Sequence, residues 1–269
     1  MSKIRPRWSP DERAGGGGFG GIAGDGLLES APRSSAVIDL SLRSRADLVE
    51  AGEPRILIFT GGTLGSWALE EVRLGDILIG ADKGALFLVR HGLRPDLALG
   101  DFDSVDEGEL EEIRCGSVRF EDCDPIMKDY TDTEMAFHRA LEWPLPAGAV
   151  PREIVLLGAL GTRFDHSLAN VHLLRIGLTR GVVCRIVDAY NEVQLIDRCV
   201  ELERGRYANV SLLPLTPEVR GITLRGFLYP LERATLAIGQ SLGISNVLVD
   251  PIGRVELEQG QLLVIRSRD

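Results

Sequence analysis

Short apolar runs alternate with amphipathic segments from residue 55 to about residue 191. The runs are rich in Ile, Val and Leu, as is typical of strands buried on both faces, and lie at 56–62, 76–81, 97–100, 118–120, 154–158 and 182–187. The segments between them carry apolar residues at helical spacing and lie at 85–91, 107–115, 133–143 and 166–179. This alternation predicts an α/β fold with a mostly parallel sheet flanked by helices.

The pattern changes after about residue 191. Short apolar runs are now separated by turns with Gly, Pro and charged residues, and lie at 193–196, 207–213, 221–224, 234–236, 247–249 and 261–265. Short strands at such spacing predict a smaller all-β domain, either a sandwich or barrel-like.

The first 53 residues differ from both parts. They contain a Gly-rich stretch, residues 15–18 and 20–24, which indicates a flexible segment. A phosphate-binding loop is the alternative, but no buried strand precedes the glycines and no Lys-Ser/Thr follows them. The chain is therefore expected to comprise an N-terminal extension at 1–53, an α/β domain at 54–191 and a β domain at 192–269.

The composition of the chain excludes several classes of function. The 269 residues carry a formal net charge of −10, which argues against a nucleic-acid surface, and a protein so acidic must supply a metal or a few placed basic residues to bind an anion. No apolar run is long enough to cross a membrane, and the N-terminus lacks the apolar stretch of a signal peptide. The four cysteines form no Cys-x-x-Cys pair and are expected to be reduced. A cytoplasmic protein is expected.

Two aspartates follow the apolar run at 97–100. Residues 97–105 read Leu-Ala-Leu-Gly-Asp-Phe-Asp-Ser-Val, so Asp101 and Asp103 come directly after a predicted strand. In an extended chain residues i and i+2 face the same way, so both carboxylates are expected to project together. Ligands bind at the carboxyl ends of strands in open α/β sheets, and Mg²⁺ takes oxygen ligands beside nucleotide phosphates. The motif predicts an Mg²⁺ site, with a turn of solvated aspartates as the alternative.

A second acidic group opens the segment at 133–143. Residues 128–134 read Lys-Asp-Tyr-Thr-Asp-Thr-Glu, in which Thr131 and Glu134 match a capping box. Capping does not require Lys128 or Asp129, and a helix N-terminus flanked by Lys and two carboxylates can hold metal and phosphate. Asp82 follows the run at 76–81 and is expected at the same edge of the sheet.

A third motif joins the run at 154–158 to the next helical segment. Residues 158–170 read Gly-Ala-Leu-Gly-Thr-Arg-Phe-Asp-His-Ser-Leu-Ala-Asn, and a helix is expected to open near Asp165 or His166. Amides at a helix start can hold phosphate oxygens, and Arg163 can chelate them with two hydrogen bonds. Considered alone, Asp165 is expected to be an N-cap, and His166 is expected to be a polar residue near the core. Their coincidence with a glycine loop and an arginine indicates a phosphate site.

These motifs, in this order, resemble the thiamine pyrophosphokinase family. The resemblance rests on Gly-Ala-Asp-Lys-Gly-Ala at 80–85, Pro-Asp-Leu-Ala-Leu-Gly-Asp-Phe-Asp-Ser at 95–104, the motifs at 128–134 and 161–170, Gly-Ile-Ser-Asn at 243–246, and the closing Gly-Gln-Leu-Leu-Val-Ile at 260–265. It covers roughly residues 55–266 and leaves out the first 50 or so.

The resemblance implies an ATP-binding α/β domain, a C-terminal β domain and a homodimer, with thiamine between the α/β domain of one subunit and the β domain of the other. It implies Mg²⁺ as the metal, and Asp101, Asp103 and Asp132 as the carboxylates that hold it and take part in catalysis together with Arg163. The residues it places at ATP and its phosphates are Asp82, Lys128, Asp129, Arg163, Asp165 and His166. It places Ser245 and Asn246 at thiamine.

Two positions depart from the family pattern. Thr162 stands where the motif often has a second glycine. In eukaryotic members a Trp beside the Ser/Asn motif stacks on thiamine, whereas here Asn246 follows Ser245 directly, which leaves the stacking residue open. Trp67 and Trp143 lie in the other domain and are expected to be packing residues.

The activity implied is ATP:thiamine diphosphotransfer, giving thiamine diphosphate and AMP, without nucleic-acid or membrane partners. Transfer to another heterocyclic alcohol, such as a hydroxymethylpterin, is an alternative. Hydrolysis of phosphate esters is a second, but it leaves the β domain unexplained. A non-catalytic nucleotide or thiamine sensor is a third, and AMP formation would separate it from the enzyme.

Overall fold

The computed structural model describes residues 54–123, 129–145 and 150–269. The extension expected at 1–53 lies outside these residues. The helices are α2 (Ser66–Leu69), α3 (Lys83–Arg90), α4 (Glu107–Gly116), α5 (Asp132–Leu141) and α6 (Phe164–Thr179). The first six strands are β1 (Arg55–Phe59), β2 (Ile77–Ala81), β3 (Leu97–Gly100), β4 (Phe120–Asp122), β5 (Glu153–Leu157) and β6 (Val183–Val187). The later strands are β7 (Asn191–Ile196), β8 (Cys199–Glu203), β9 (Asn209–Pro214), β10 (Glu218–Arg225), β11 (Ala234–Ala237), β12 (Asn246–Val247), β13 (Ile252–Glu256) and β14 (Leu262–Ser267).

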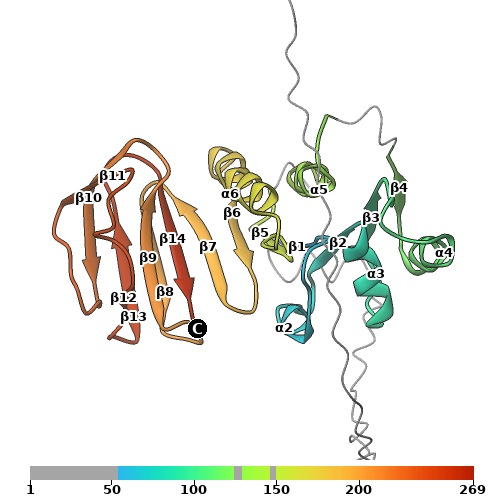
Figure 1. Cartoon of the computed structure of the whole chain (residues 1–269), viewed down its shortest axis with the longest axis horizontal. Helices are drawn as coiled ribbons and strands as arrows, with labels where there is room; N and C mark the ends of the chain where they lie inside the picture. Colours follow the sequence, from blue (N-terminus) through green and yellow to red (C-terminus); the bar gives the residue numbers. More distant parts are fainter. Residues whose placement is uncertain (1–53, 124–128, 146–149) are drawn as a thin grey trace, which may run out of the picture. The chain divides into compact units, whose positions relative to one another are not determined.

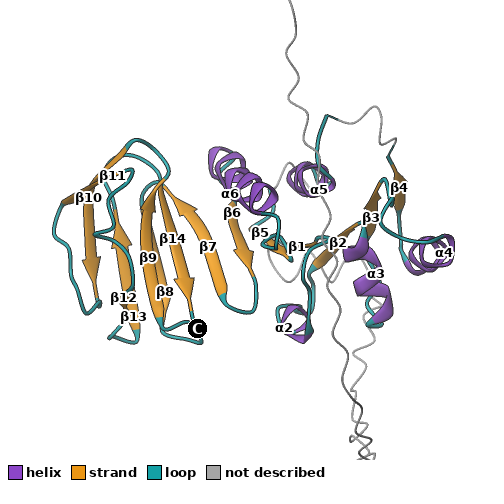
Figure 2. Ribbon diagram, viewed as in Figure 1, coloured by secondary structure: helices purple, strands orange, loops and turns teal. Residues whose placement is uncertain are grey.

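The first six strands form a parallel sheet in the order β6-β5-β1-β2-β3-β4, which confirms the predicted α/β architecture (Figure 1). Its central strands are buried on both faces, as their unbroken apolar runs predict. One face packs against α5 and α6 through side chains such as Phe137 and Leu173. The other is covered by α2 and α3 (Figure 2), which pack on it through side chains such as Ala68 and Leu88, and Trp67 joins this layer. Both Trp67 and Trp143 pack against these cores, as predicted.

The same sheet continues into the C-terminal part of the chain. β7 pairs antiparallel with β6, and the sheet then runs through β14 and β9 to β12, giving ten strands in all. A second sheet, in the order β11-β10-β13-β8, stacks on this extension and closes an apolar core that contains Val210, Ile222, Val255 and Val264. The C-terminal part is therefore a β sandwich, one of the two architectures expected, and it shares a sheet with the α/β part.

Some elements were not predicted from the sequence. The strands β8 and β13 and the short helix α2 are absent from the pattern of apolar runs. β8 and β13 are short and alternate with charged residues, and β13 contains Gly253, so neither forms an apolar run. They become strands because each finds a partner, β13 lying between β10 and β8.

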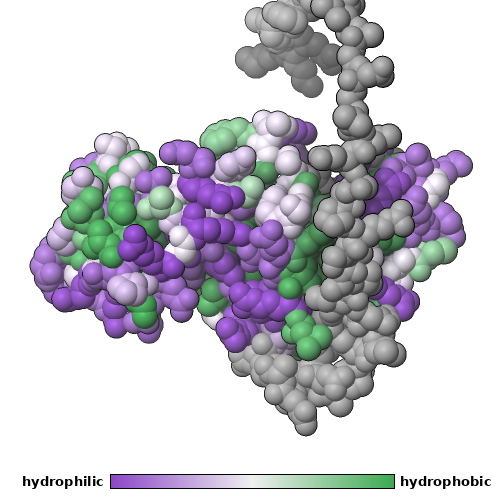
Figure 3. All heavy atoms as spheres, turned by 90° about the horizontal axis from the view of Figure 1, so that it is seen from below, coloured by the Kyte–Doolittle hydropathy of each residue, from purple (hydrophilic) through white to green (hydrophobic). Residues whose placement is uncertain are grey.

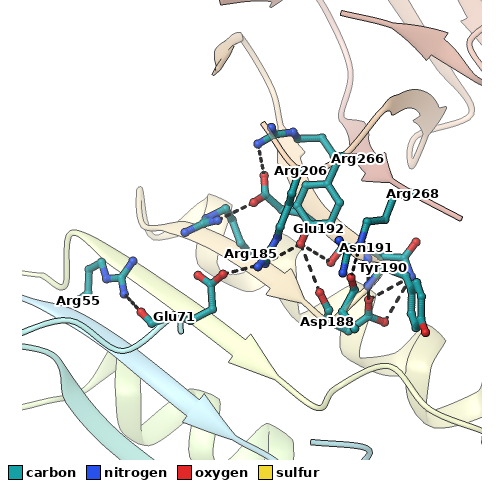
Figure 4. Close-up of polar contacts among 12 residues, drawn as sticks. Arg55, Glu71, Arg185, Asp188, Tyr190, Asn191, Glu192, Arg206, Arg266 and Arg268 are labelled. Carbon is teal, nitrogen blue, oxygen red and sulfur yellow. Dashed lines mark hydrogen bonds and ion pairs between the residues drawn. The ribbon is translucent and has the colours of Figure 1, made fainter. Parts of the chain in front are cut away.

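A ladder of ion pairs crosses the sheet from β1 to β14, and Figure 4 shows its part around Glu192. Glu153 on β5 contacts both Arg55 on β1 and Arg185 on β6, at 3.5 and 2.6 Å. Glu192 on β7 contacts Arg185 at 2.8 Å and Arg266 on β14 at 3.1 Å. All five side chains are largely buried, with 6 to 16% of their surface exposed. The ladder therefore ties the parallel strands to the sandwich strands by charge as well as by backbone pairing.

The electrostatics of Glu153 show that these pairs favour the ionised state. Burial raises the pKa of this carboxyl, but the hydrogen bond and charge of Arg185, together with the charge of Arg55, outweigh burial and leave the pKa below its usual value. A further contact joins Arg206, before β9, to Glu71, before β2, at 2.8 Å.

All four cysteines are free, as predicted. Among the described residues, no helix has the length and apolar character that crossing a membrane requires.

Candidate active site

Three carboxylates meet at the carboxyl edge of the parallel sheet. Asp82 follows β2, and Asp101 and Asp103 follow the adjacent strand β3. Each offers an oxygen, and these oxygens lie within 4.8 Å of one another. Sequence reasoning placed Asp101 and Asp103 together as metal ligands and assigned Asp82 to the phosphates, and the structure places Asp82 in the same cluster.

The carboxylates do not converge in the way the sequence suggested. We expected an extended chain from Asp101 to Asp103, but Phe102 adopts a left-handed conformation with φ +52°. The chain turns here, and the Asp103 N–H donates to the Asp101 Oδ1 at 3.3 Å. The buried ring of Phe102 packs among Ala85, Ala98 and Ile113, and this apolar anchor accounts for the turn.

Asp82 holds this turn from the neighbouring strand. Its Oδ1 accepts the Phe102 N–H at 3.1 Å, and its own N–H donates to the Leu99 carbonyl at 3.1 Å. Gly100, with φ +149°, makes room for the carboxylate, since a Cβ at this position would lie 2.3 Å from the Asp82 Oδ1. The glycine before the two aspartates is therefore a requirement of the site itself.

Burial and the neighbouring Asp132 change the ionisation of Asp82. Burial, followed by the charge of Asp132 and a hydrogen bond with it, raises the pKa of Asp82 from 3.8 to about 7. The Phe102 N–H opposes this shift, and the charge of Asp101 adds to it. Asp132, which the resemblance placed with the metal ligands, thus contacts the cluster through Asp82.

The start of α5 positions Asp132 beside Asp82. Thr131 is the N-cap, and its hydroxyl accepts the Glu134 N–H at 3.2 Å, as the capping pattern predicts. Asp132 is the first residue of the helix. Asp129 precedes this turn and is exposed. Lys128, expected at the phosphates, lies outside the described residues.

The loop after β5 and the start of α6 form the third side of this edge. The helix begins at Phe164, one residue before the expected start, and Asp165 and His166 lie in its first turn while Arg163 occupies the N-cap position. Arg163 and Asp165 form an exposed ion pair at 2.6 Å, with both guanidinium contacts on the carboxylate. The hydrogen bond from Arg163 lowers the pKa of Asp165 to about 2.

Two side chains of α6 hold this loop in place. Ser167 accepts the Gly161 N–H at 3.1 Å and donates to the Arg163 carbonyl at 3.1 Å. Asn170 is buried and donates to the Ala159 carbonyl at 2.8 Å. Ser167 and Asn170 therefore shape the loop that carries Arg163.

The Ser245-Asn246 motif, which the resemblance placed at thiamine, lies in the sandwich at β12. Ser245 is exposed, has φ +56°, and donates its N–H to the Ser211 hydroxyl at 3.0 Å. Asn246 is only 7% exposed, and its carboxamide bonds to the backbone of Tyr229. The side chain of Tyr229 is 64% exposed. Sequence reasoning missed Tyr229, although its aromatic ring and the following Pro230 were readable signals.

The donor set at the sheet edge suits a hard divalent cation. Three carboxylates close together repel one another, and a cation among them removes that repulsion. All the candidate ligands in the cluster are oxygens, which favours Mg²⁺ over softer metals.

The parallel sheet with acidic groups and a helix N-terminus at its carboxyl edge defines a phosphotransferase type of α/β protein with an added β sandwich. Two family models match the chain: "Thiamin pyrophosphokinase, catalytic domain" over residues 70–184 and "Thiamin pyrophosphokinase, vitamin B1 binding domain" over residues 198–262. The chain belongs to the thiamine pyrophosphokinase family of enzymes.

Individual relatives agree with the family models. The thiamine pyrophosphokinase of Bacillus subtilis is 34% identical over 195 residues, which are 71% of this chain and 87% of the relative. The crystal structure of thiamine pyrophosphokinase from Bacillus subtilis superposes with a TM-score of 0.72 at 31% identity, covering 80% of this chain and 99% of that one. The yeast enzyme has a TM-score of 0.66 at 15% identity, covers 83% of this chain and 90% of its own, and supports the fold alone.

Proposed function

We propose that this chain transfers the diphosphate of ATP to the hydroxyl of thiamine, giving thiamine diphosphate and AMP. The observation that carries the proposal is the carboxylate cluster of Asp82, Asp101 and Asp103 at the carboxyl edge of the sheet, in a chain of this family. A second binding part, the sandwich, suits a reaction with two substrates.

Asp82, Asp101 and Asp103 would hold Mg²⁺ at the phosphates of ATP. When bound there, the ion would neutralise charge on the phosphate oxygens. The remaining work of these residues is positioning, which accounts for most of the barrier lowering in phosphoryl-type transfers. Arg163 lies exposed at the N-terminus of α6, where its guanidinium can exchange Asp165 for a phosphate oxygen. Asp165 and His166 flank it, and Lys128 and Asp129 are proposed to contribute from the start of α5.

The reaction forms a bond from the thiamine hydroxyl oxygen to the β-phosphorus of ATP. The bond from that phosphorus to the oxygen bridging to the α-phosphorus breaks, and AMP leaves with the bonding electrons. The hydroxyl proton must pass to a base. Asp132 is the proposed acceptor, because its carboxylate lies beside the cluster in contact with Asp82.

Thiamine is proposed to bind at the exposed surface around Ser245. The Tyr229 ring is the aromatic group available beside this motif, and it supplies a face for a cationic aromatic heterocycle. Ser245 supplies a hydroxyl on an exposed turn.

We propose a homodimer, because one protomer cannot bring its two half-sites together. Ser245 directly precedes β12, which ends the ten-stranded sheet, whereas Asp101 and Asp103 follow β3, eight strand steps away (Figure 1). At about 4.8 Å per step this separation is about 38 Å, far longer than one thiamine molecule. A second copy would place its sandwich at the first copy's acidic edge.

The sandwich also carries an apolar surface that suits a partner. Several of its large apolar side chains are exposed, among them Leu228 at 52%, Ile238 at 61% and Leu242 at 66%. Figure 3 shows apolar side chains gathered over this part of the molecule on the face it displays. Sedimentation of the full chain is expected to give twice the 29.3 kDa of one chain, and a monomer fully active at assay concentration would contradict the proposal.

The activity is tested by incubating the chain with ATP, MgCl₂ and thiamine and resolving AMP, ADP and thiamine diphosphate. AMP and thiamine diphosphate in equal amounts are expected. AMP without thiamine diphosphate would point to another acceptor, which a hydroxymethylpterin would test, or to hydrolysis. If no divalent metal supports turnover, the non-catalytic sensor becomes the favoured function. We also place the chain in the cytoplasm, where ATP is present and free cysteines stay reduced.

The carboxylate cluster is tested by Asp101→Asn, which keeps the shape of the side chain and removes its charge. We expect kcat to fall by about 100-fold or more, the scale of losing one charge-stabilising group from a transition state. Glu107→Gln, on the exposed face of α4, is the matched control and should keep its activity. A folded Asp101→Asn variant with near-normal turnover would remove the metal assignment.

A further inference from the structure

The carboxamide of Asn246 makes three hydrogen bonds, all of them to backbone groups. Its Oδ1 accepts the N–H of Tyr229 at 3.1 Å and the N–H of Val247 at 2.8 Å. Its Nδ2 donates to the Tyr229 carbonyl at 2.7 Å. Because one Tyr229 group needs an acceptor and the other a donor, only one orientation of the amide satisfies both. With 7% of its surface exposed, Asn246 has little left to offer a ligand.

The side chain of Asn246 takes the place of a strand partner. Just before Tyr229, the Leu228 N–H donates to the Val247 carbonyl at 2.9 Å, and Phe227 forms an antiparallel bridge with Leu248. At Tyr229 the backbone pairing ends, and the Asn246 amide supplies the next donor and acceptor. The following Pro230 further restricts the Tyr229 backbone to extended conformations.

The result is a fixed backbone that carries an exposed ring. Tyr229 lies outside the named strands, between β10 and β11, yet both of its backbone hydrogen-bonding groups are held. Its ring remains 64% exposed. A rigid aromatic side chain loses little conformational entropy when a ligand stacks on it, so restraining its backbone favours binding.

We infer that Asn246 is a positioning residue, which fixes the Tyr229 ring for an aromatic cationic substrate and does not itself contact that substrate. The inference rests on the proposed function, in which this surface binds thiamine. An Asn or Gln amide offers a neutral donor and acceptor side by side on one planar group, and the shorter Asn reaches the neighbouring chain from β12. Asp would keep the acceptor and lose the donor to the Tyr229 carbonyl.

The test is a double-mutant cycle on the KM for thiamine, measured with the full chain. Tyr229→Leu and Asn246→Asp should each raise this KM by about tenfold, with kcat and the KM for ATP within about twofold of wild type. In the Tyr229→Leu background, Asn246→Asp should add no more than about twofold, because its effect passes through the ring. Tyr229→Phe, which keeps the ring, should restore the thiamine KM to within about twofold of wild type.

Tyr190→Leu is the matched control, since Tyr190 is also an exposed tyrosine, at 57%. If Asn246→Asp does not fold, Asn246→Ser replaces it in the same cycle, since a water can then bridge to Tyr229. An equal KM increase with and without the Tyr229 ring would overturn the inference, because Asn246 would then act directly or through the fold. Wild-type chain that makes no thiamine diphosphate would instead defeat the proposed function, and the inference with it.

Discussion

At the scale of the residue, Asp82 has the least expected role. The sequence places it after a strand, but its contacts come from the next strand along the sheet, through Phe102, and from α5, through Asp132. Burial, followed by the charge of Asp132 and its hydrogen bond, raises the pKa of Asp82 to about 7 against the opposing Phe102 N–H, so the carboxyl holds a proton over much of the pH range in which other aspartates are ionised. The cluster that would receive a cation is therefore under electrostatic strain.

This predicts how Mg²⁺ stabilises the protein at different pH values. The pKa of Asp82 is raised in the folded state, so its favourable contribution is present below about pH 4 and is lost as pH rises through about 7. A divalent cation favours the ionised carboxyl and reverses that loss. The increase in Tm caused by MgCl₂ should therefore be larger at about pH 8 than at about pH 6.

Thermal unfolding with and without MgCl₂ measures this difference. In Asp82→Asn the increase in Tm caused by MgCl₂ should depend much less on pH. In Glu107→Gln, which lies outside the cluster, it should depend on pH as in wild type. The same Tm increase at both pH values in the wild-type chain would show that Asp82 does not titrate in the cation site.

At the scale of the element, the loop after β5 depends on the helix that follows it. α6 sends Ser167 and Asn170 back to the loop, and Asn170 satisfies the buried carbonyl of Ala159. A helix start alone would leave the loop between Gly158 and Arg163 free to adopt several conformations. The two side chains select one of them and so position the helix N-terminus that is proposed to face phosphate.

Asn170→Leu should loosen this loop. The Ala159 carbonyl would lose its partner, which should lower the free energy of unfolding by about 1–3 kcal/mol. The KM for ATP should rise, because Arg163 is held less firmly, whereas the KM for thiamine should change little. His172→Leu, on the exposed side of the same helix, is the control. Urea unfolding and steady-state kinetics measure both effects, and an unchanged KM for ATP in a destabilised variant would confine Asn170 to folding.

At the scale of the whole molecule, the ion-pair ladder joins the two parts of the chain. Glu192 lies between Arg185 and Arg266, so it links β6 of the parallel sheet to β14 of the sandwich (Figure 4). Buried pairs of this kind contribute little over apolar residues, but removing one partner leaves charge without compensation. The ladder therefore makes the two parts depend on each other for stability.

Glu192→Gln should lower the free energy of unfolding by about 3 kcal/mol, since Arg185 and Arg266 both lose a carboxylate. Glu258→Gln is the matched control, because it breaks the exposed pair with Arg233 and should cost less than about 1 kcal/mol. Urea denaturation compares the two variants. An equal decrease in the free energy of unfolding in both variants would show that the buried ion pairs contribute no more to stability than the exposed pair.

Much of the fold follows from local patterns. The six parallel strands and the four main helices lie within a few residues of their predicted positions, because buried runs and helical spacing are properties of short segments. β8 and β13 were not predicted, because these segments form strands only by pairing with neighbouring strands. That one sheet continues from the α/β part into the sandwich could not be predicted for the same reason, since the β6–β7 pairing is set by tertiary contacts.

The sequence by itself determined the family, the order of the motifs and the acidic residues that carry the proposed chemistry, because each motif is a short stretch whose residue types are constrained together. Only the tertiary structure decided that Phe102 turns left-handed, that Asp82 joins Asp101 and Asp103, and that Asn246 holds Tyr229. Each of these depends on groups that meet across strands or loops about 17 to 20 residues apart. Such contacts leave no local pattern in the chain, because only packing brings the partners together.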